Sequence, residues 1–139
     1  MLPEWEQGVP AVLAVAGPHA IPVSTALRAG DARVVLALGR RRETLARLRG
    51  DPAVALCVLA AGVAFTAYGR ARVVREELDG APQVVAVAID VERVQDHLDG
   101  SRTELLDAAR WRWTEETAAE DERRIVAELR DLIRGNRPA

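Results

Sequence analysis

Lysine is absent from this sequence of 139 residues, because all 19 positively charged side chains are arginines. The 21 acidic residues bring the formal net charge to −2. This balance excludes the strongly basic character that is typical of nucleic-acid-binding domains. Exclusive use of arginine, with many alanines, valines and glycines, indicates the codon bias of a GC-rich genome. A cluster of arginines is therefore weak evidence for a ligand when it stands alone.

Cysteine and histidine are nearly missing as well. Cys57 is the only cysteine, so the chain forms no internal disulfide and no cysteine metal cluster. Its apolar neighbours indicate a small buried side chain. His19 and His97 are the only histidines. Neither lies in a metal-binding pattern, and we expect no metal site.

Long apolar runs and an extended series of aromatic residues are also lacking. The longest mostly apolar stretches, such as 53–61, are too short to span a bilayer. The first residues lack the basic start and apolar stretch of a signal peptide. Three tryptophans, one tyrosine and one phenylalanine leave no interleaved aromatic pattern for stacking on nucleic-acid bases. We therefore expect a cytoplasmic protein without a membrane or nucleic-acid partner.

The first two-thirds of the sequence reads as a series of β-strands. A hydrophobic fraction of 49% and this chain length predict one folded domain over residues 1–139. Turn residues separate apolar runs that are nearly continuous rather than strictly alternating, which indicates strands covered on both faces, in a closed barrel or at a subunit interface. The runs are 11–16, 21–27, 33–38, 53–59, 63–75 and 84–91.

The run 63–75 gives the clearest strand. Odd-numbered residues from Phe65 to Val73 share one face, and Thr66, Tyr68 and the arginines 70 and 72 share the other. Gly69 interrupts the apolar face, which predicts a bulge or a close approach of another backbone.

Two helices are predicted. Thr44, Leu45 and Leu48 have helical spacing, and the sequence Gly50-Asp51-Pro52 ends the helix, which we place at about 41–49. A second helix at about 115–134 carries one apolar stripe that includes Ile125 and Leu129. Residues 92–101 show no clear pattern.

The clearest candidate for a ligand-binding site is the start of the first predicted helix. A helix N-terminus presents free N–H groups and a partial positive charge, and Arg40, Arg41 and Arg42 crowd this position. A phosphate bound by the backbone, the Thr44 hydroxyl and an arginine would explain the arrangement. A solvated basic surface is the alternative.

The order of these segments resembles the small proteins related to pyridoxamine 5′-phosphate oxidase. The resemblance extends from about Val12 to Ile89 and rests on an apolar hairpin, a third strand, LGRRRETLARLRGDP, a further strand and FTAYGRARVV. It implies a mainly β (α+β) fold, namely a six-stranded antiparallel split β-barrel with a short crossover helix and a C-terminal helix. It also implies a homodimer with FMN, or a deazaflavin in some branches, at the subunit interface.

Family motifs match this chain residue by residue only in part. The Ser-Arg-Lys motif of many family members, or a near variant of it, falls on residues 42–44 of this chain. Thr44 can still donate a hydroxyl to phosphate, and Arg42 supplies charge one position early. Glu43 replaces a common arginine, and its carboxylate would repel phosphate unless it pairs with Arg47 at i,i+4. In the matching second strand, PVSTALR, the resemblance places three side chains along the flavin: Ser24, Thr25 and Arg28.

Two classes of function remain open. One is an FMN-dependent oxidoreductase, in which the cofactor carries the redox step and few acid or base residues are needed. The other is a non-catalytic protein that binds a flavin, a deazaflavin or another small ligand and has lost part of the phosphate site. Trp111 and Trp113, on one face of an extended segment, are interpreted as packing residues or as a lid over the flavin. The sequence names no substrate.

Overall fold

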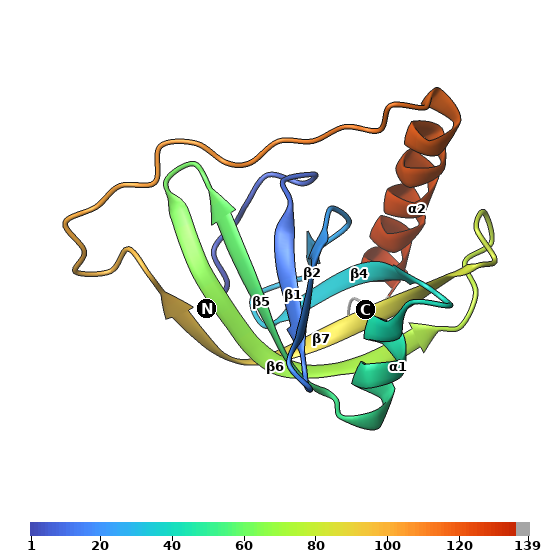
Figure 1. The fold of residues 1–139 in the computed structure, drawn as a ribbon, viewed down its shortest axis with the longest axis horizontal. Helices are drawn as coiled ribbons and strands as arrows, with labels where there is room; N and C mark the ends of the chain where they lie inside the picture. The colour runs from blue at the N-terminus through green and yellow to red at the C-terminus, as the bar shows by residue number, and fades with distance from the viewer. Residues whose placement is uncertain (136–139) are drawn as a thin grey trace.

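One curved antiparallel sheet forms the body of the protein, in a computed structural model that describes residues 1–135. Seven strands follow the order β2-β1-β5-β6-β7-β4-β3 and curl into a half-barrel (Figure 1). The strands are β1 (Ala11–Val15), β2 (His19–Val23), β3 (Leu27–Arg28), β4 (Arg33–Gly39), β5 (Ala53–Ala60), β6 (Val63–Arg75) and β7 (Val84–Asp96); the helices are α1 (Glu43–Gly50) and α2 (Glu116–Gly135).

The split barrel predicted from the sequence is confirmed, although the strand count is seven rather than six. The run predicted as one strand over 21–27 is interrupted. β2 ends at Val23 and pairs with β1, whereas β3 begins at Leu27 and pairs with β4 at the opposite edge of the sheet. The residues between them carry the chain from one edge to the other, so one apolar run serves both edges of the half-barrel.

β6 and β7 are the long strands that shape the sheet. Each has 13 residues, and their register shifts between Tyr68 and Gly69, where Glu92 has no partner on β6. A Cβ atom at Gly69 would lie 2.1 Å from the carbonyl oxygen of Asp90. The predicted bulge and close backbone approach are therefore confirmed. β7 also continues to Asp96, beyond the predicted end at residue 91.

The concave side of the sheet contains the main core. Phe65, Leu36 and Leu56 are fully buried there, and Trp5 packs on Phe65 with ring centroids 5.6 Å apart. The inward residues of β6 are those predicted from its alternation. The half-barrel is thus filled by side chains.

α2 covers the outer face of β4 and β7 (Figure 1). Leu129 is fully buried, and Val126 is nearly so, in a second apolar cluster with Val35, Ala86 and Ala88. The helix runs close to the predicted range of 115–134. Residues between β7 and α2 lack regular structure and cross one end of the half-barrel in Figure 1.

Asp90 connects three neighbouring strands through its carboxylate. Its Oδ2 atom accepts a hydrogen bond of 2.8 Å from Nε of Arg72 on β6, and its Oδ1 atom accepts one of 3.0 Å from Nε of Arg33 on β4. These two bonds, that from Arg72 foremost, hold the pKa of Asp90 below its ordinary value of 3.8, although partial burial opposes them.

A lowered pKa in the folded state stabilises the protein above the unfolded-state pKa and is lost as the pH falls through the folded-state value. We therefore expect Asp90→Asn to lower the free energy of unfolding at neutral pH and to make its decline below about pH 4 shallower. The carboxylate is half exposed, so the loss should be at most about 1 kcal/mol. Urea unfolding at neutral and acidic pH measures both quantities. Glu92→Gln, at an exposed position of the same strand, should change neither.

Candidate functional site

The turn between β4 and α1 separates the three consecutive arginines. Arg40 turns away from the helix, and its Nη2 atom donates to the carbonyl oxygens of Glu76 and Pro82, at 2.6 and 2.9 Å. Its backbone N–H donates to Gln83. Arg40 thus fastens the loop between β6 and β7 to the end of β4, and its guanidinium is engaged away from the helix start.

Arg41 and Arg42 remain at the start of α1. Both are exposed, and within residues 1–135 neither side chain has a hydrogen-bond or ion-pair partner. Arg42 is the N-cap residue, with extended backbone and no side-chain capping bond. The exposed start of α1 therefore offers free backbone N–H groups and two consecutive arginines whose guanidinium groups have no partner among residues 1–135, which is an arrangement that suits an anion.

Thr44 is not available to a ligand in this conformation. It is 1% exposed, and its Oγ1 atom lies 2.9 Å from Nε2 of His19, the first residue of β2. The hydroxyl thereby joins α1 to the β1–β2 hairpin. No signal in the sequence indicated this contact, since 25 residues separate the two positions.

Glu43 is held beside the helix start by its own neighbours. Its Oε2 atom lies 3.0 Å from Nδ1 of His19 and accepts a hydrogen bond of 3.2 Å from Nε of Arg47. Arg47 also donates through Nη1 to the carbonyl oxygen of Ala16. The i,i+4 pair expected from the sequence is therefore present. His19 and Arg47 complete a network that the sequence did not predict, and this network draws the carboxylate towards the hairpin.

The second-strand candidates lie in the connection between β2 and β3 and at its end. Ser24 donates to Oε1 of Glu122 on α2 at 2.5 Å. Thr25 is almost buried, and its Oγ1 atom accepts from the backbone N–H of Ala37 on β4 at 3.0 Å. These hydroxyl groups hold the irregular connection against α2 and β4.

Arg28 holds the N-terminal segment. Its Nε and Nη2 atoms donate to the carbonyl oxygen of Leu2 at 3.1 and 3.0 Å, and Nη2 lies 3.5 Å from Asp31. Among the described residues, no hydrogen bond or ion pair joins Ser24, Thr25 or Arg28 to the start of α1. The structure thus divides the candidates into a helix-start group and a strand group.

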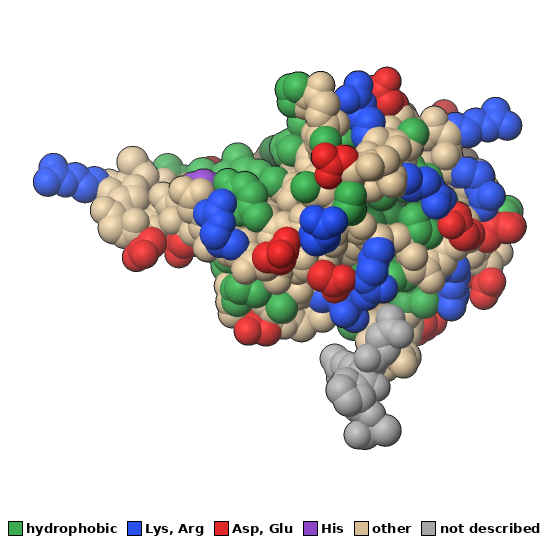
Figure 2. All heavy atoms as spheres, turned by 90° about the horizontal axis from the view of Figure 1, so that it is seen from below, with side chains coloured by type: hydrophobic (Ala, Val, Ile, Leu, Met, Phe, Trp, Pro, Cys, Tyr) green, Lys and Arg blue, Asp and Glu red, His purple; other side chains and the backbone are tan. Residues whose placement is uncertain are grey.

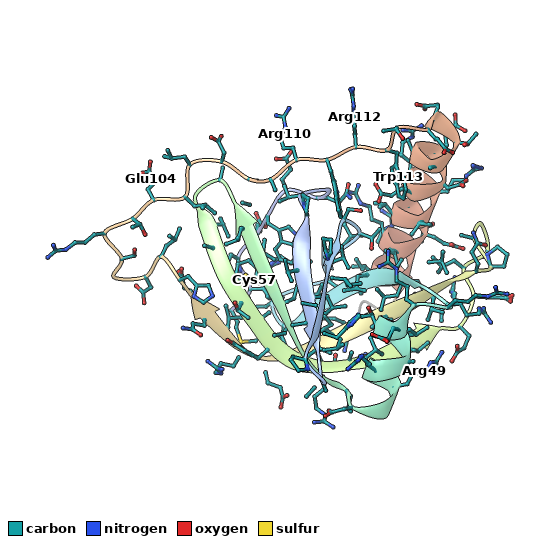
Figure 3. All side chains as sticks on the ribbon, in the orientation of Figure 1. Arg49, Cys57, Glu104, Arg110, Arg112 and Trp113 are labelled. Atoms are coloured by element: carbon teal, nitrogen blue, oxygen red, sulfur yellow. The ribbon has the colours of Figure 1, made fainter. Side chains whose placement is uncertain are left out.

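The two tryptophans of the extended segment are less packed than expected. Trp111 and Trp113 are about half exposed, at 49% and 54%. In Figure 3, the side chains of Arg110 and Arg112 point away from the sheet. Because side chains alternate along extended backbone, Trp111 points to the other side, and it lines a groove at the end of the half-barrel.

Charges of both signs are mixed on the face shown in Figure 2, where arginines and acidic side chains intermingle. Within residues 1–135 no group of three His, Cys, Asp or Glu side chains could hold a metal ion. Over the same residues, no helix is both long and apolar enough to cross a membrane.

Solved structures with the same architecture include three informative examples. A candidate pyridoxamine 5′-phosphate oxidase from Listeria innocua is 20% identical, with a TM-score of 0.53 over 66% of this chain and 89% of its own. An F420 reductase is 13% identical, with a TM-score of 0.56 over 68% of this chain and 98% of its own. The chain has the split-barrel fold of the pyridoxamine 5′-phosphate oxidase-like proteins.

Split barrels of this kind differ in what they bind. A heme binding protein from Mycobacterium smegmatis is 20% identical, with a TM-score of 0.53 over 75% of this chain and 53% of its own. No model of a protein family matches the sequence, and no curated protein matches it either. At these identities the likeness establishes the fold alone, and the function has to be argued from the site.

Proposed function

We propose that this split barrel binds FMN and serves as a flavin-dependent oxidoreductase. The observation that carries the proposal is the exposed, unpartnered pair Arg41 and Arg42 at the N-terminus of α1. A bound phosphate would accept hydrogen bonds from free backbone N–H groups and neutralise both guanidinium groups. An F420 reductase among the proteins of similar fold supports a flavin-type ligand.

FMN would supply hydride transfer when bound. The chain's own residues would hold and orient it. Arg41 and Arg42 would bind the phosphate, whereas Arg40 would brace the turn on which they stand through its bonds to the β6–β7 loop. Ser24, Thr25 and Arg28 remain proposed neighbours of the flavin. Their present partners are Glu122, Ala37 and Leu2, so they would contact the ring only after exchanging those bonds.

A second candidate is a non-catalytic protein that binds a flavin, a deazaflavin or another small ligand without a full phosphate site. The burial of Thr44 favours it. The Thr44 hydroxyl lies against His19 and is withdrawn from the helix start, which removes a donor from the phosphate site. The Glu43 carboxylate also stands next to the helix start, although its pairing with Arg47 reduces its repulsion of an anion.

Titration of the protein with FMN and with riboflavin separates the two candidates, because only FMN carries a phosphate. If the phosphate lies at α1, FMN should bind more tightly, and Arg41→Ala should remove about 1.5–3 kcal/mol of that preference. Glu43→Arg should increase the preference. Calorimetry and flavin absorbance provide the measurement.

Arg49→Ala is the matched control for this titration. Arg49 lies in the last turn of α1 and pairs with Glu76, so it carries the same charge at the other end of the helix (Figure 3). Its removal should leave the difference between FMN and riboflavin unchanged. The phosphate site would be contradicted if FMN and riboflavin bound with equal affinity and neither Arg41→Ala nor Glu43→Arg changed this. That result would favour the second candidate.

We also propose that the protein is a homodimer. β2, β1 and β5 lie side by side, and the pairs Val12↔Pro22 and Val12↔Cys57 place these three residues in one row. The row is apolar and faces outward, since Val12 is 41% exposed while its neighbour Leu13 is buried. Within the described chain no helix covers this face, whereas α2 covers the β4–β7 side. A second copy would remove it from water.

Light scattering at micromolar concentration should therefore report about twice the chain mass of 15.1 kDa. A charge in the centre of the interface would be left without a partner, so Val12→Glu should shift the population to monomer. Leu106→Glu, at a position 71% exposed on the extended segment, should have no such effect. A wild-type protein of single-chain mass would contradict the proposal.

A further inference from the structure

Two irregular segments border a groove at one end of the half-barrel. The N-terminal segment supplies Trp5, and the extended segment between β7 and α2 supplies Trp111. The end of β5, the β5–β6 turn and the start of β6 complete the lining with Ala60, Ala61 and Val63. The groove has a volume of about 740 Å³, which lies in the range of small-molecule sites. It shares no residue with the start of α1.

Specific contacts hold the two segments that border the groove. Nε1 of Trp5 donates to the carbonyl oxygen of Ala26 at 3.4 Å, and the indole ring packs on Phe65. The extended segment is tied to the sheet before it reaches Trp111, because the backbone N–H of Gly62 donates to the carbonyl oxygen of Leu105 at 2.8 Å and Ala108 packs against the main core. Trp5 is thus anchored directly, and Trp111 follows a segment that is anchored at Leu105 and Ala108.

The charges around the groove are mostly negative. Glu4, Glu6 and Asp107 line it together with a single cationic residue, Arg110. None of these four side chains forms an ion pair within residues 1–135. The Arg110 side chain points away from the sheet in Figure 3. A ligand in the groove would therefore meet two indole rings and an excess of carboxylates.

We propose that this groove binds a flat organic cation, namely a positively charged group carried on an aromatic ring system. Indole rings attract cations through the negative face of the π-system and stack on flat aromatic ligands. The three carboxylates favour a positive ligand and disfavour an anionic one of the same shape. The groove is a separate site from the proposed flavin site, and its ligand binding does not depend on a bound flavin.

Three tricyclic probes of nearly the same shape test the role of charge. Proflavine is cationic, acridine is neutral at mildly alkaline pH, and acridine-9-carboxylate is anionic. Calorimetry with the full chain should give the tightest binding for proflavine and the weakest for the carboxylate, with a difference of about tenfold or more. Equal binding of all three probes, or no binding of any, would overturn the proposal.

Matched pairs of variants locate the binding site. Trp111→Ala should weaken proflavine binding about tenfold, whereas Trp113→Ala, outside the groove, should leave it unchanged. Asp107→Asn should weaken it about threefold, whereas Glu104→Gln on the same extended segment should not. Equal losses within either pair would overturn the assignment to the groove. A different result would assign the groove to a second copy of the chain and would also overturn the proposal. In that case no probe would bind, and Trp111→Ala would convert the dimer to monomer.

Discussion

Gly69→Ala is expected to cause a large loss of stability, although it adds only one methyl group. The added Cβ atom would lie 2.1 Å from the carbonyl oxygen of Asp90 and 3.0 Å from Cα of Val91. Both atoms belong to the backbone of β7, so no side chain can rotate to make room. The strands would have to separate at the bulge that bends them, at a cost of about 3 kcal/mol or more.

Gly50→Ala is the matched control. Gly50 is the last residue of α1, its φ is not positive, and a Cβ atom there would meet nothing within 4 Å. Its replacement should be neutral or stabilise the protein by up to about 1 kcal/mol. Urea unfolding followed by tryptophan fluorescence compares the two variants. If the two variants unfold at the same urea concentration, the close contact between Gly69 on β6 and the backbone of β7 is absent from the protein.

Leu129→Ala is expected to produce the second large effect. Leu129 on α2 is fully buried against the outer face of the sheet, among Val35, Ala86 and Ala88. Truncation to alanine removes apolar contacts and leaves a cavity, which costs about 2–5 kcal/mol at such sites. Small alanines on the facing strands have no long side chains that could fill the space, so the upper half of that range is expected.

Leu106→Ala provides the same chemical change at a position that is 71% exposed, and it should alter stability by less than about 0.5 kcal/mol. The comparison also tests whether α2 belongs to the cooperative unit. Its side chains reach Ser24 and the backbone N–H of Asp79, so we expect helix and sheet to unfold together. An unfolding midpoint unchanged by Leu129→Ala would show that α2 contributes little to the sheet's stability.

Much of the helix-start site was visible in the sequence, but the roles of its residues were not. Three adjacent arginines predicted a common phosphate site. The structure leaves Arg41 and Arg42 at the helix start, and it places the Arg40 guanidinium on the loop that follows β6. Glu43 and Arg47 are four residues apart on one helix, so their pairing could be predicted. The contacts of His19 with Glu43 and Thr44 could not, since they depend on how the β1–β2 hairpin lies against α1.

The sequence by itself determined where most strands and helices lie and which residues of β6 face inward. Side-chain alternation and helical spacing are patterns of a few neighbouring residues, so they can be recognised without knowledge of the rest of the chain. Gly69 was also informative alone, because a glycine inside an apolar strand often marks a bulge or a close approach of another backbone.

Only the tertiary structure decided how the chain breaks after Val23, how far β7 extends, and what the polar side chains bind. The connection at Ser24 is stabilised by Glu122, which is 98 residues away. The end of β7 at Asp96 is set by pairing with Phe65 of β6, since its own sequence shows no strand pattern there. Closure of the half-barrel brings these distant groups together. The energy of such contacts depends on that geometry, and local sequence does not encode it.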